Sequence, residues 1–168
     1  MKKIRLYEIS IIIFFVLLPI VGSGFEVFIL TLGIGTIGVM FKWFVFSGVG
    51  LRLFTAGLKQ VIKPSFTAKE IFKAEDEKSF IIVREIGLAN ISMGLVGILS
   101  IYLSEFRFAA AMTGGLYFCL AGGLHLFNGK RSNEEVFPII TDFYIALVLL
   151  ILAIFNVKKI INFDKIVV

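Results

Sequence analysis

Five long apolar runs constrain this chain more than any other feature. They occupy residues 8–32, 39–62, 80–102, 106–127 and 138–157, and a helix needs about 20 predominantly apolar residues to cross the hydrocarbon core of a bilayer. Backbone groups that face lipid are satisfied only in helices or closed barrels, and the strict alternation of barrel strands is sustained nowhere. The runs therefore predict an all-α, polytopic transmembrane helix bundle of five spans, forming a single integral membrane domain over residues 1–168.

Charge is scarce and lies mainly at the ends of these runs. Hydrophobic residues make up 58% of the chain and charged residues 17%, too few charges to give a protein of this size a water-facing surface. The net charge of +5 could suit a nucleic-acid-binding protein, but the cations flank the apolar runs, as Lys2, Lys59, Lys63 and Lys158 do. The lipid bilayer is therefore the expected partner, and nucleic acid is not.

The first run allows more than one interpretation. Residues 22–24 are Gly, Ser and Gly, and a second glycine cluster lies at residues 33–38, so the turn that ends the first span could fall at either. A bundle of four spans is the alternative. The start MKKIR and the apolar residues 9–20 also resemble a signal peptide, with residues 22–24 as its cleavage site.

One loop, residues 63–79, is long enough to have structure of its own. Its mixed charges surround the apolar pair Ile71 and Phe72. This pattern predicts an interfacial segment in which the pair dips into the headgroup region as part of a short amphipathic helix, capped by Ser65 or Thr67. An ordinary solvated connector fits the pattern equally well.

The distribution of Lys and Arg predicts the orientation of the chain. The N-terminus, the loop 63–79 and the segment 129–135 carry most of these residues, and five spans place all three on one side. Because cytoplasmic loops are enriched in Lys and Arg, we expect a multi-pass protein of the cell (plasma) membrane with its N-terminus in the cytoplasm and its C-terminus outside. The lysines after the last span oppose this assignment.

Five polar residues inside the predicted spans are candidates for a functional site. They are Arg52, Glu85, Asn90, His125 and Asp142. Such groups are costly to place in lipid and usually face a bundle interior, a partner or a water-filled cavity. Counted from the side of the loop 63–79, all five fall in one half of the bundle, so we expect them to converge there as a ligand-binding or polar cluster.

Arg52 is the one of the five that costs the most free energy to place in lipid. It can pair with Glu85 or Asp142, or with the anionic headgroup of a ligand. The alternative is an ion pair that only fixes packing, or an arginine that reaches the interface. Lys42 and Arg84 lie closer to span ends and can extend to the interface more easily.

His125 and Cys119 are the only residues of their types. A metal site with several histidines and a bis-histidine haem are therefore not predicted, and the sequence identifies no cofactor. His125 with Glu85 or Asp142 could act as an acid or base. Glycines on one face of the third span, at positions 87, 94 and 97, favour close helix packing.

From about residue 41 to residue 150 the chain resembles a known family. The resemblance rests on the segments KWFVFSGVG, REIGLANISMGLVGILS and GGLYFCLAGGLHLFNGKRSNEEVFPIITD. The positions that match are Glu85, Gly87, Ala89, Asn90, His125, Asn133 and Asp142, whereas Leu88 and Arg52 depart from the pattern. This is an uncharacterised family of small multi-spanning prokaryotic membrane proteins, a domain of unknown function, so the resemblance implies no activity. More loosely, the build is similar to that of DoxX-type proteins.

Three functions are compatible with these residues. The first is binding or transport of a lipid, a quinone-like compound or another amphipathic molecule in a polar intramembrane pocket. The second is a scaffold or accessory subunit, as a homo-oligomer or in a membrane complex, whose polar groups only hold helices together. The third, which the residues favour least, is a membrane enzyme that uses His125 for proton transfer.

Overall fold

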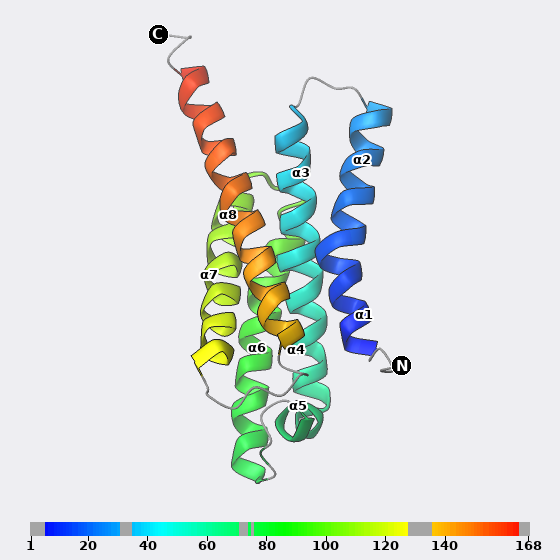
Figure 1. The fold of residues 1–168 in the computed structure, drawn as a ribbon, viewed down its shortest axis with the longest axis vertical. Helices are drawn as coiled ribbons and strands as arrows, with labels where there is room; N and C mark the ends of the chain where they lie inside the picture. Colours follow the sequence, from blue (N-terminus) through cyan, green and yellow to red (C-terminus); the bar gives the residue numbers. More distant parts are fainter. Residues whose placement is uncertain (1–5, 31–34, 71–73, 75, 128–135, 165–168) are drawn as a thin grey trace.

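The fold is a bundle of long helices (Figure 1). A computed structural model describes residues 6–30, 35–70, 74, 76–127 and 136–164, and these ranges contain helices and no strand. Five helical stretches are long and apolar enough to cross a membrane, namely Glu8–Ile29, Thr36–Ile62, Glu77–Leu99, Glu105–Phe127 and Val136–Asn156. The prediction of an all-α, multi-pass membrane protein with five spans is therefore confirmed, and the alternative of four spans is wrong.

The first two spans each contain a wider, π-helical turn. The first span consists of α1 (Leu6–Ile12), the π-helix η1 (Ile13–Leu17) and α2 (Leu18–Leu30). The second consists of α3 (Thr36–Phe44), the π-helix η2 (Val45–Leu51) and α4 (Arg52–Ile62). Because α2 continues through residues 22–24 to Leu30, the first two spans are joined at the second glycine cluster, of which residues 33 and 34 lie outside the described residues.

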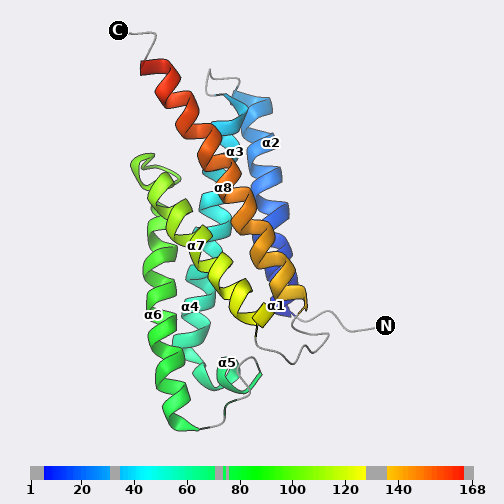
Figure 2. The same cartoon turned by 60° about the vertical axis from the view of Figure 1, so that its left-hand side comes forward.

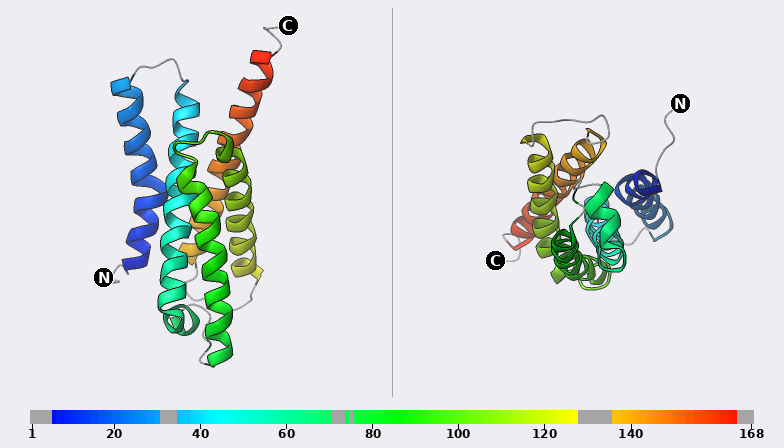
Figure 3. Two further views of the ribbon diagram at one scale, coloured as in Figure 1. Left: turned by 180° about the vertical axis from the view of Figure 1, so that it is seen from behind. Right: turned by 90° about the horizontal axis from the view of Figure 1, so that it is seen from below.

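The remaining helices complete an up-and-down arrangement. They are α5 (Pro64–Glu70), α6 (Glu77–Leu99), α7 (Glu105–Phe127) and α8 (Val136–Asp164). Figures 1 and 3 show that α1 begins at the end of the bundle where α5 lies and that α8 ends at the opposite end. We call these the α5 end and the α8 end.

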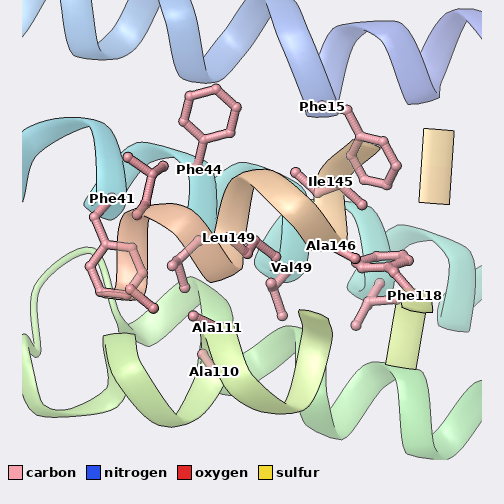
Figure 4. Packing of buried hydrophobic residues seen from close by; sticks show 14 of the residues in the cluster. Phe15, Phe41, Phe44, Val49, Ala110, Ala111, Phe118, Ile145, Ala146 and Leu149 are labelled. Carbon is pink, nitrogen blue, oxygen red and sulfur yellow. The ribbon is translucent and has the colours of Figure 1, made fainter. Parts of the chain in front are cut away.

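The core surrounds η2. Most residues of this π-helix are buried, and they contact η1, α6, α7 and α8. Figure 4 shows Val49 of η2 among Ala110 and Ala111 of α7 and Leu149 of α8. Large apolar side chains on the outer faces are exposed, Phe28 by 86% and Leu120 by 72%. Such a surface suits lipid and not water.

Glycines bring the second and third spans into backbone contact. A β-carbon added at Gly57 would lie 2.5 Å from the carbonyl oxygen of Gly87, and one added at Gly97 would lie 2.5 Å from the amide nitrogen of Gly50. No side chain fits at these distances, so the glycine face of α6 packs against η2 and α4. In lipid, where apolar burial gives no driving force between helices, this close approach supplies the packing energy.

The loop between the second and third spans contains the short helix α5, which lies across the α5 end of the bundle (Figure 2). Its Pro64, Thr67 and Ala68 are buried, whereas Ser65 and Phe66 are exposed. Because the helix already begins at Pro64, a residue suited to a first turn, the prediction that Ser65 or Thr67 caps its start is wrong. Ile71 and Phe72 lie outside the described residues.

Asp76 caps the start of α6. Its carboxylate accepts hydrogen bonds from the backbone N–H of Ser79 at 2.9 Å and from the Ser79 hydroxyl. These bonds favour the ionised form, and the pKa of Asp76 is lowered below its usual range, chiefly by the Ser79 side chain. The cap fixes where the third span begins.

Candidate functional site

Arg52 is the first residue of α4 and follows the buried π-helix η2 directly. Its Nε is buried and has no hydrogen-bond partner. Among the described residues, no carboxylate oxygen lies within 4.0 Å of its guanidinium nitrogens. The structure therefore places a cation inside the bundle without a direct counter-ion, which is unusual for an arginine at membrane depth.

Two side chains from other helices act on Arg52 at longer range. Asp142 in α8 and Tyr117 in α7 both interact with it electrostatically. Asp142 lies beside Gly122 of α7, where an added β-carbon would be 3.4 Å from the Asp142 β-carbon. The glycine thus lets α7 and α8 approach each other next to the carboxylate. We call Arg52, Tyr117 and Asp142 the Arg52 centre.

Further cations continue from Arg52 toward the α5 end. The charges of Arg52 and Lys63 both act on Lys59, and the ammonium of Lys59 lies 3.7 Å from the centre of the Phe66 ring of α5. Residues 52–69 contain no Asp or Glu. This side of the bundle therefore carries positive charge from the interface inward.

Asn90 belongs to a separate contact. It is 2% exposed, and its Nδ2 donates a hydrogen bond of 2.8 Å to Oε1 of Gln60, which ties α6 to α4. Its Oδ1 is buried without a partner. Gln60 was not among the predicted residues, because a glutamine near a span end resembles an interfacial residue. Only its position could have indicated this contact, because it lies two residues before the end of α4, opposite the glycine face of α6.

Glu85 and His125 lie apart from these contacts. Glu85 is exposed on α6, and His125 is partly exposed near the end of α7. In the part of the chain that the structure describes, no hydrogen bond or ion pair joins either residue to Arg52, Asn90 or Asp142. Of the five predicted residues, the structure thus brings Arg52 and Asp142 into electrostatic range and engages Asn90 elsewhere. The described ranges also contain no group of three His, Cys, Asp or Glu residues that could hold a metal ion.

A second polar cluster, absent from the sequence predictions, lies toward the α8 end. The carboxylate of Glu26 in α2 accepts hydrogen bonds from Lys42 Nζ and, at 2.7 Å, from Trp43 Nε1. Lys42 therefore forms an ion pair within the bundle. We call Glu26, Lys42, Trp43 and Arg107 the Glu26 cluster.

Arg107 joins this cluster from α7. It interacts electrostatically with Glu26, and it donates hydrogen bonds to the carbonyl oxygens of Ser100 at 2.9 Å and Ile101 at 3.3 Å. These carbonyls follow the end of α6, where helical backbone acceptors lack internal partners. Every charged group of the Glu26 cluster thus has a partner within the chain.

Comparisons with known proteins place the chain in a family without assigning a role. No curated protein and no solved structure matches it, so the looser likeness to DoxX-type proteins stays a prediction. The resemblance to an uncharacterised family is confirmed over a longer stretch than its motifs cover. The chain belongs to the family of unknown function DUF6790, whose family model matches residues 9–160.

Proposed function

We propose that this membrane protein binds, and in doing so can transport, an amphipathic molecule whose anionic or hydrogen-bond-accepting headgroup contacts Arg52. A lipid or a quinone-like compound has this chemistry. The observation that carries the proposal is the buried Nε of Arg52 without a partner. A membrane-embedded arginine normally gains hydrogen bonds from a carboxylate or from backbone carbonyls, and a ligand headgroup would supply them here.

The surroundings of Arg52 support a ligand over a simple ion pair. Asp142 acts on Arg52 only from a distance, so the planar donor face of the guanidinium is not saturated by the carboxylate. Tyr117 is partly exposed beside the same cation and brings a hydroxyl that can donate or accept. A headgroup in this place would meet one cation, one hydroxyl and one carboxylate.

A scaffold or accessory subunit, alone or as a homo-oligomer, is the second candidate. It is favoured by the contact between α4 and α6, where Asn90 and Gln60 bond to each other and the glycines press backbone against backbone. These polar groups already have a packing role. The enzyme hypothesis has less support, since no carboxylate in the described ranges lies within 4.0 Å of His125.

Mass spectrometry of the purified protein tests the proposal. The full chain is extracted in mild detergent, and the lipophilic molecules that remain bound are identified for the unmodified protein, Arg52→Ala and Glu85→Gln. The third is a matched control, because Glu85 is an exposed charge in a neighbouring span. We expect one enriched class of amphiphile that Arg52→Ala loses and Glu85→Gln keeps. The same unselective lipid in all three samples would overturn the proposal.

The proposed setting is the cell membrane, with the α5 end of the bundle in the cytoplasm. The Lys and Arg distribution supports this orientation. Labelling of single cysteines placed near α5 and near the α2–α3 turn, with a reagent that does not cross membranes, would test it in intact cells. We expect labelling near the α2–α3 turn and none near α5. Labelling near α5 and none near the turn would show that the orientation is the opposite one.

A further inference from the structure

Three cations follow one another along α4 from the interface into the bundle. Lys63 directly follows the helix, Lys59 lies one turn earlier, and Arg52 begins the helix. Over the eleven residues that separate Arg52 from Lys63 the helix rises about 16 Å, or half of a hydrocarbon core. Residues seven and eleven positions apart share one side of a helix, and the charges of Arg52 and Lys63 both act on Lys59, so the three cations line one side of α4.

The outer part of this side of α4 has the composition of a membrane interface. Lys59, Lys63 and Lys69 are exposed, and beside them Ile62 is 69% exposed and Phe66 is 40% exposed. Exposed lysines mixed with exposed apolar side chains are typical of surfaces that meet lipid headgroups. Figure 2 shows α5 lying across the bundle at this level, with the start of α4 deeper in the bundle.

Acidic residues are scarce on α4 and α5, where Glu70, the last residue of α5, is the single carboxylate in the sequence of the two helices. The first carboxylate that follows Arg52 in the sequence is that of Glu70. At the start of α6, Asp76 is engaged by Ser79, and Glu77 is exposed at the first helical position. Lysines therefore dominate the part of this end that α4 and α5 form.

The opposite end offers no comparable route. Its described cations within the bundle, Lys42 and Arg107, are engaged with Glu26 and with the carbonyl oxygens after α6. An anion that approached from the α8 end would have to displace these partners. An anion from the α5 end would meet the exposed Lys59, Lys63 and Lys69 first and Arg52 afterwards.

We propose that Lys59, Lys63 and Lys69 gather anionic phospholipid from the leaflet at the α5 end, and that an anionic headgroup reaches Arg52 along α4 from this end. The inference rests on the proposed function for its last step, binding at Arg52. It adds the class of ligand and the side from which the ligand enters. An acidic protein segment at the same lysines is a different partner, which the experiment below distinguishes.

The test measures lipid selectivity of the full chain in phosphatidylcholine bilayers. Spin-labelled phosphatidylglycerol and spin-labelled phosphatidylcholine are compared by the fraction that the protein immobilises. We expect the unmodified protein to prefer phosphatidylglycerol, and Lys59→Gln with Lys63→Gln to reduce this preference at least fivefold, since each lysine near an anionic surface is worth a factor of about five. Lys78→Gln, which removes an exposed lysine of α6 outside the surface formed by α4 and α5, is the matched control and should reduce the preference less than the double variant does.

The outcomes separate the inference from the function on which it rests. If the double variant keeps the preference while Arg52→Ala loses its bound amphiphile, the inference is overturned and the proposed function stands. If the unmodified protein shows no preference, or if its lysines bind an acidic peptide and not phosphatidylglycerol, the inference is also overturned. Should the double variant not fold, the unmodified protein still tests the inference. High salt must weaken a preference for phosphatidylglycerol that depends on exposed lysines, and a preference that high salt leaves unchanged would overturn the inference.

Discussion

The Glu26 cluster and the Arg52 centre show two ways in which one membrane bundle holds charge. In the Glu26 cluster, a single carboxylate accepts hydrogen bonds from Lys42 and Trp43 and attracts Arg107. In the Arg52 centre, the cation has an unpartnered Nε and only distant electrostatic contacts. Both cations, Lys42 and Arg52, stand on the same span. The two places thus differ in pairing, because Arg52 alone of these cations keeps a buried donor without a hydrogen-bond partner in the described part of the chain.

The π-helix η2 separates Lys42 of the Glu26 cluster from Arg52 along the second span. It begins after α3, which carries Lys42, and ends immediately before Arg52. Ser47 in its middle donates a hydrogen bond of 2.5 Å to the carbonyl oxygen of Phe14 in η1, so the wide turns of the first two spans face each other. A π-helical turn shifts the phase of the residues that follow it, and such turns are frequent at functional sites. Here the shift lets one span direct its two cations to different neighbours.

The largest expected effect comes from breaking the saturated cluster. Glu26→Gln should lower the free energy of unfolding by about 3 kcal/mol, because Lys42 would be left as an unpaired charge in the bundle. The measurement is unfolding by denaturing detergent in bicelles. Glu105→Gln, an exposed carboxylate at the start of α7, is the control and should change little.

This variant should not affect ligand binding. If Glu26→Gln lost the bound amphiphile while its unfolding free energy stayed the same, the two clusters would have exchanged roles and the comparison would fail.

The next effect concerns Asp142, the negative charge that shares the Arg52 centre with a ligand. Asp142→Asn should tighten binding of an anionic amphiphile about fivefold, since removing a nearby like charge is worth about 1 kcal/mol at the effective dielectric of a protein. Titration of the detergent-solubilised protein with lysophosphatidylglycerol measures the change. Weaker binding would mean that Asp142 helps to hold the ligand.

A smaller effect is expected at the contact between α4 and α6. Asn90→Ala removes the hydrogen bond to Gln60 and should cost about 1 kcal/mol of unfolding free energy, the usual value for an interhelical hydrogen bond in a membrane. Ser92→Ala is the control, because the Ser92 hydroxyl bonds only to the carbonyl oxygen of Leu88 in its own helix. Loss of the bound amphiphile in Asn90→Ala would show that Asn90 belongs to the ligand site.

The smallest effect lies outside both clusters, at the Asp76 cap. The pKa of Asp76 is lower in the folded protein than its usual value, so the cap contributes stability above the usual pKa of an aspartate and loses it as the pH falls through the folded value. The protection of the amides in the first turn of α6 against hydrogen exchange, relative to their intrinsic rates at each pH, should fall at acid pH for this reason. Asp76→Asn, which caps a helix without titrating, should remove that pH dependence; if it persists, the cap is not its source.

The spans could be predicted from the sequence because apolar length is a local property. The predicted spans 106–127 and 80–102 differ from the helices Glu105–Phe127 and Glu77–Leu99 by three residues or fewer at each end. The pairing of Glu26 with Lys42 could not be predicted in the same way. It depends on the first turn falling at the second glycine cluster, a choice that the glycine pattern left open.

The candidate site was predicted less completely, for reasons of helical phase. Gly87, Gly94 and Gly97 face α4 and η2, and residues two positions apart on a helix do not share a face. Glu85, two residues before Gly87, therefore points away from α4, and the glycine pattern of α6 could have predicted this. The relative directions of Lys42 and Arg52 could not be predicted from the sequence, because a regular helical repeat does not reveal the π-helix between them.

The unfolding free energy of Arg52→Met, measured on protein stripped of bound lipid, tests whether the chain holds Arg52 unpaired for a ligand. If the chain leaves Arg52 unpaired for a ligand, then replacing it with an apolar side chain of similar length removes a costly charge, and the variant should be as stable as the unmodified protein or more stable. A loss of about 3 kcal/mol, like that expected for Glu26→Gln, would contradict the account and show that Arg52 is a structural ion-pair partner.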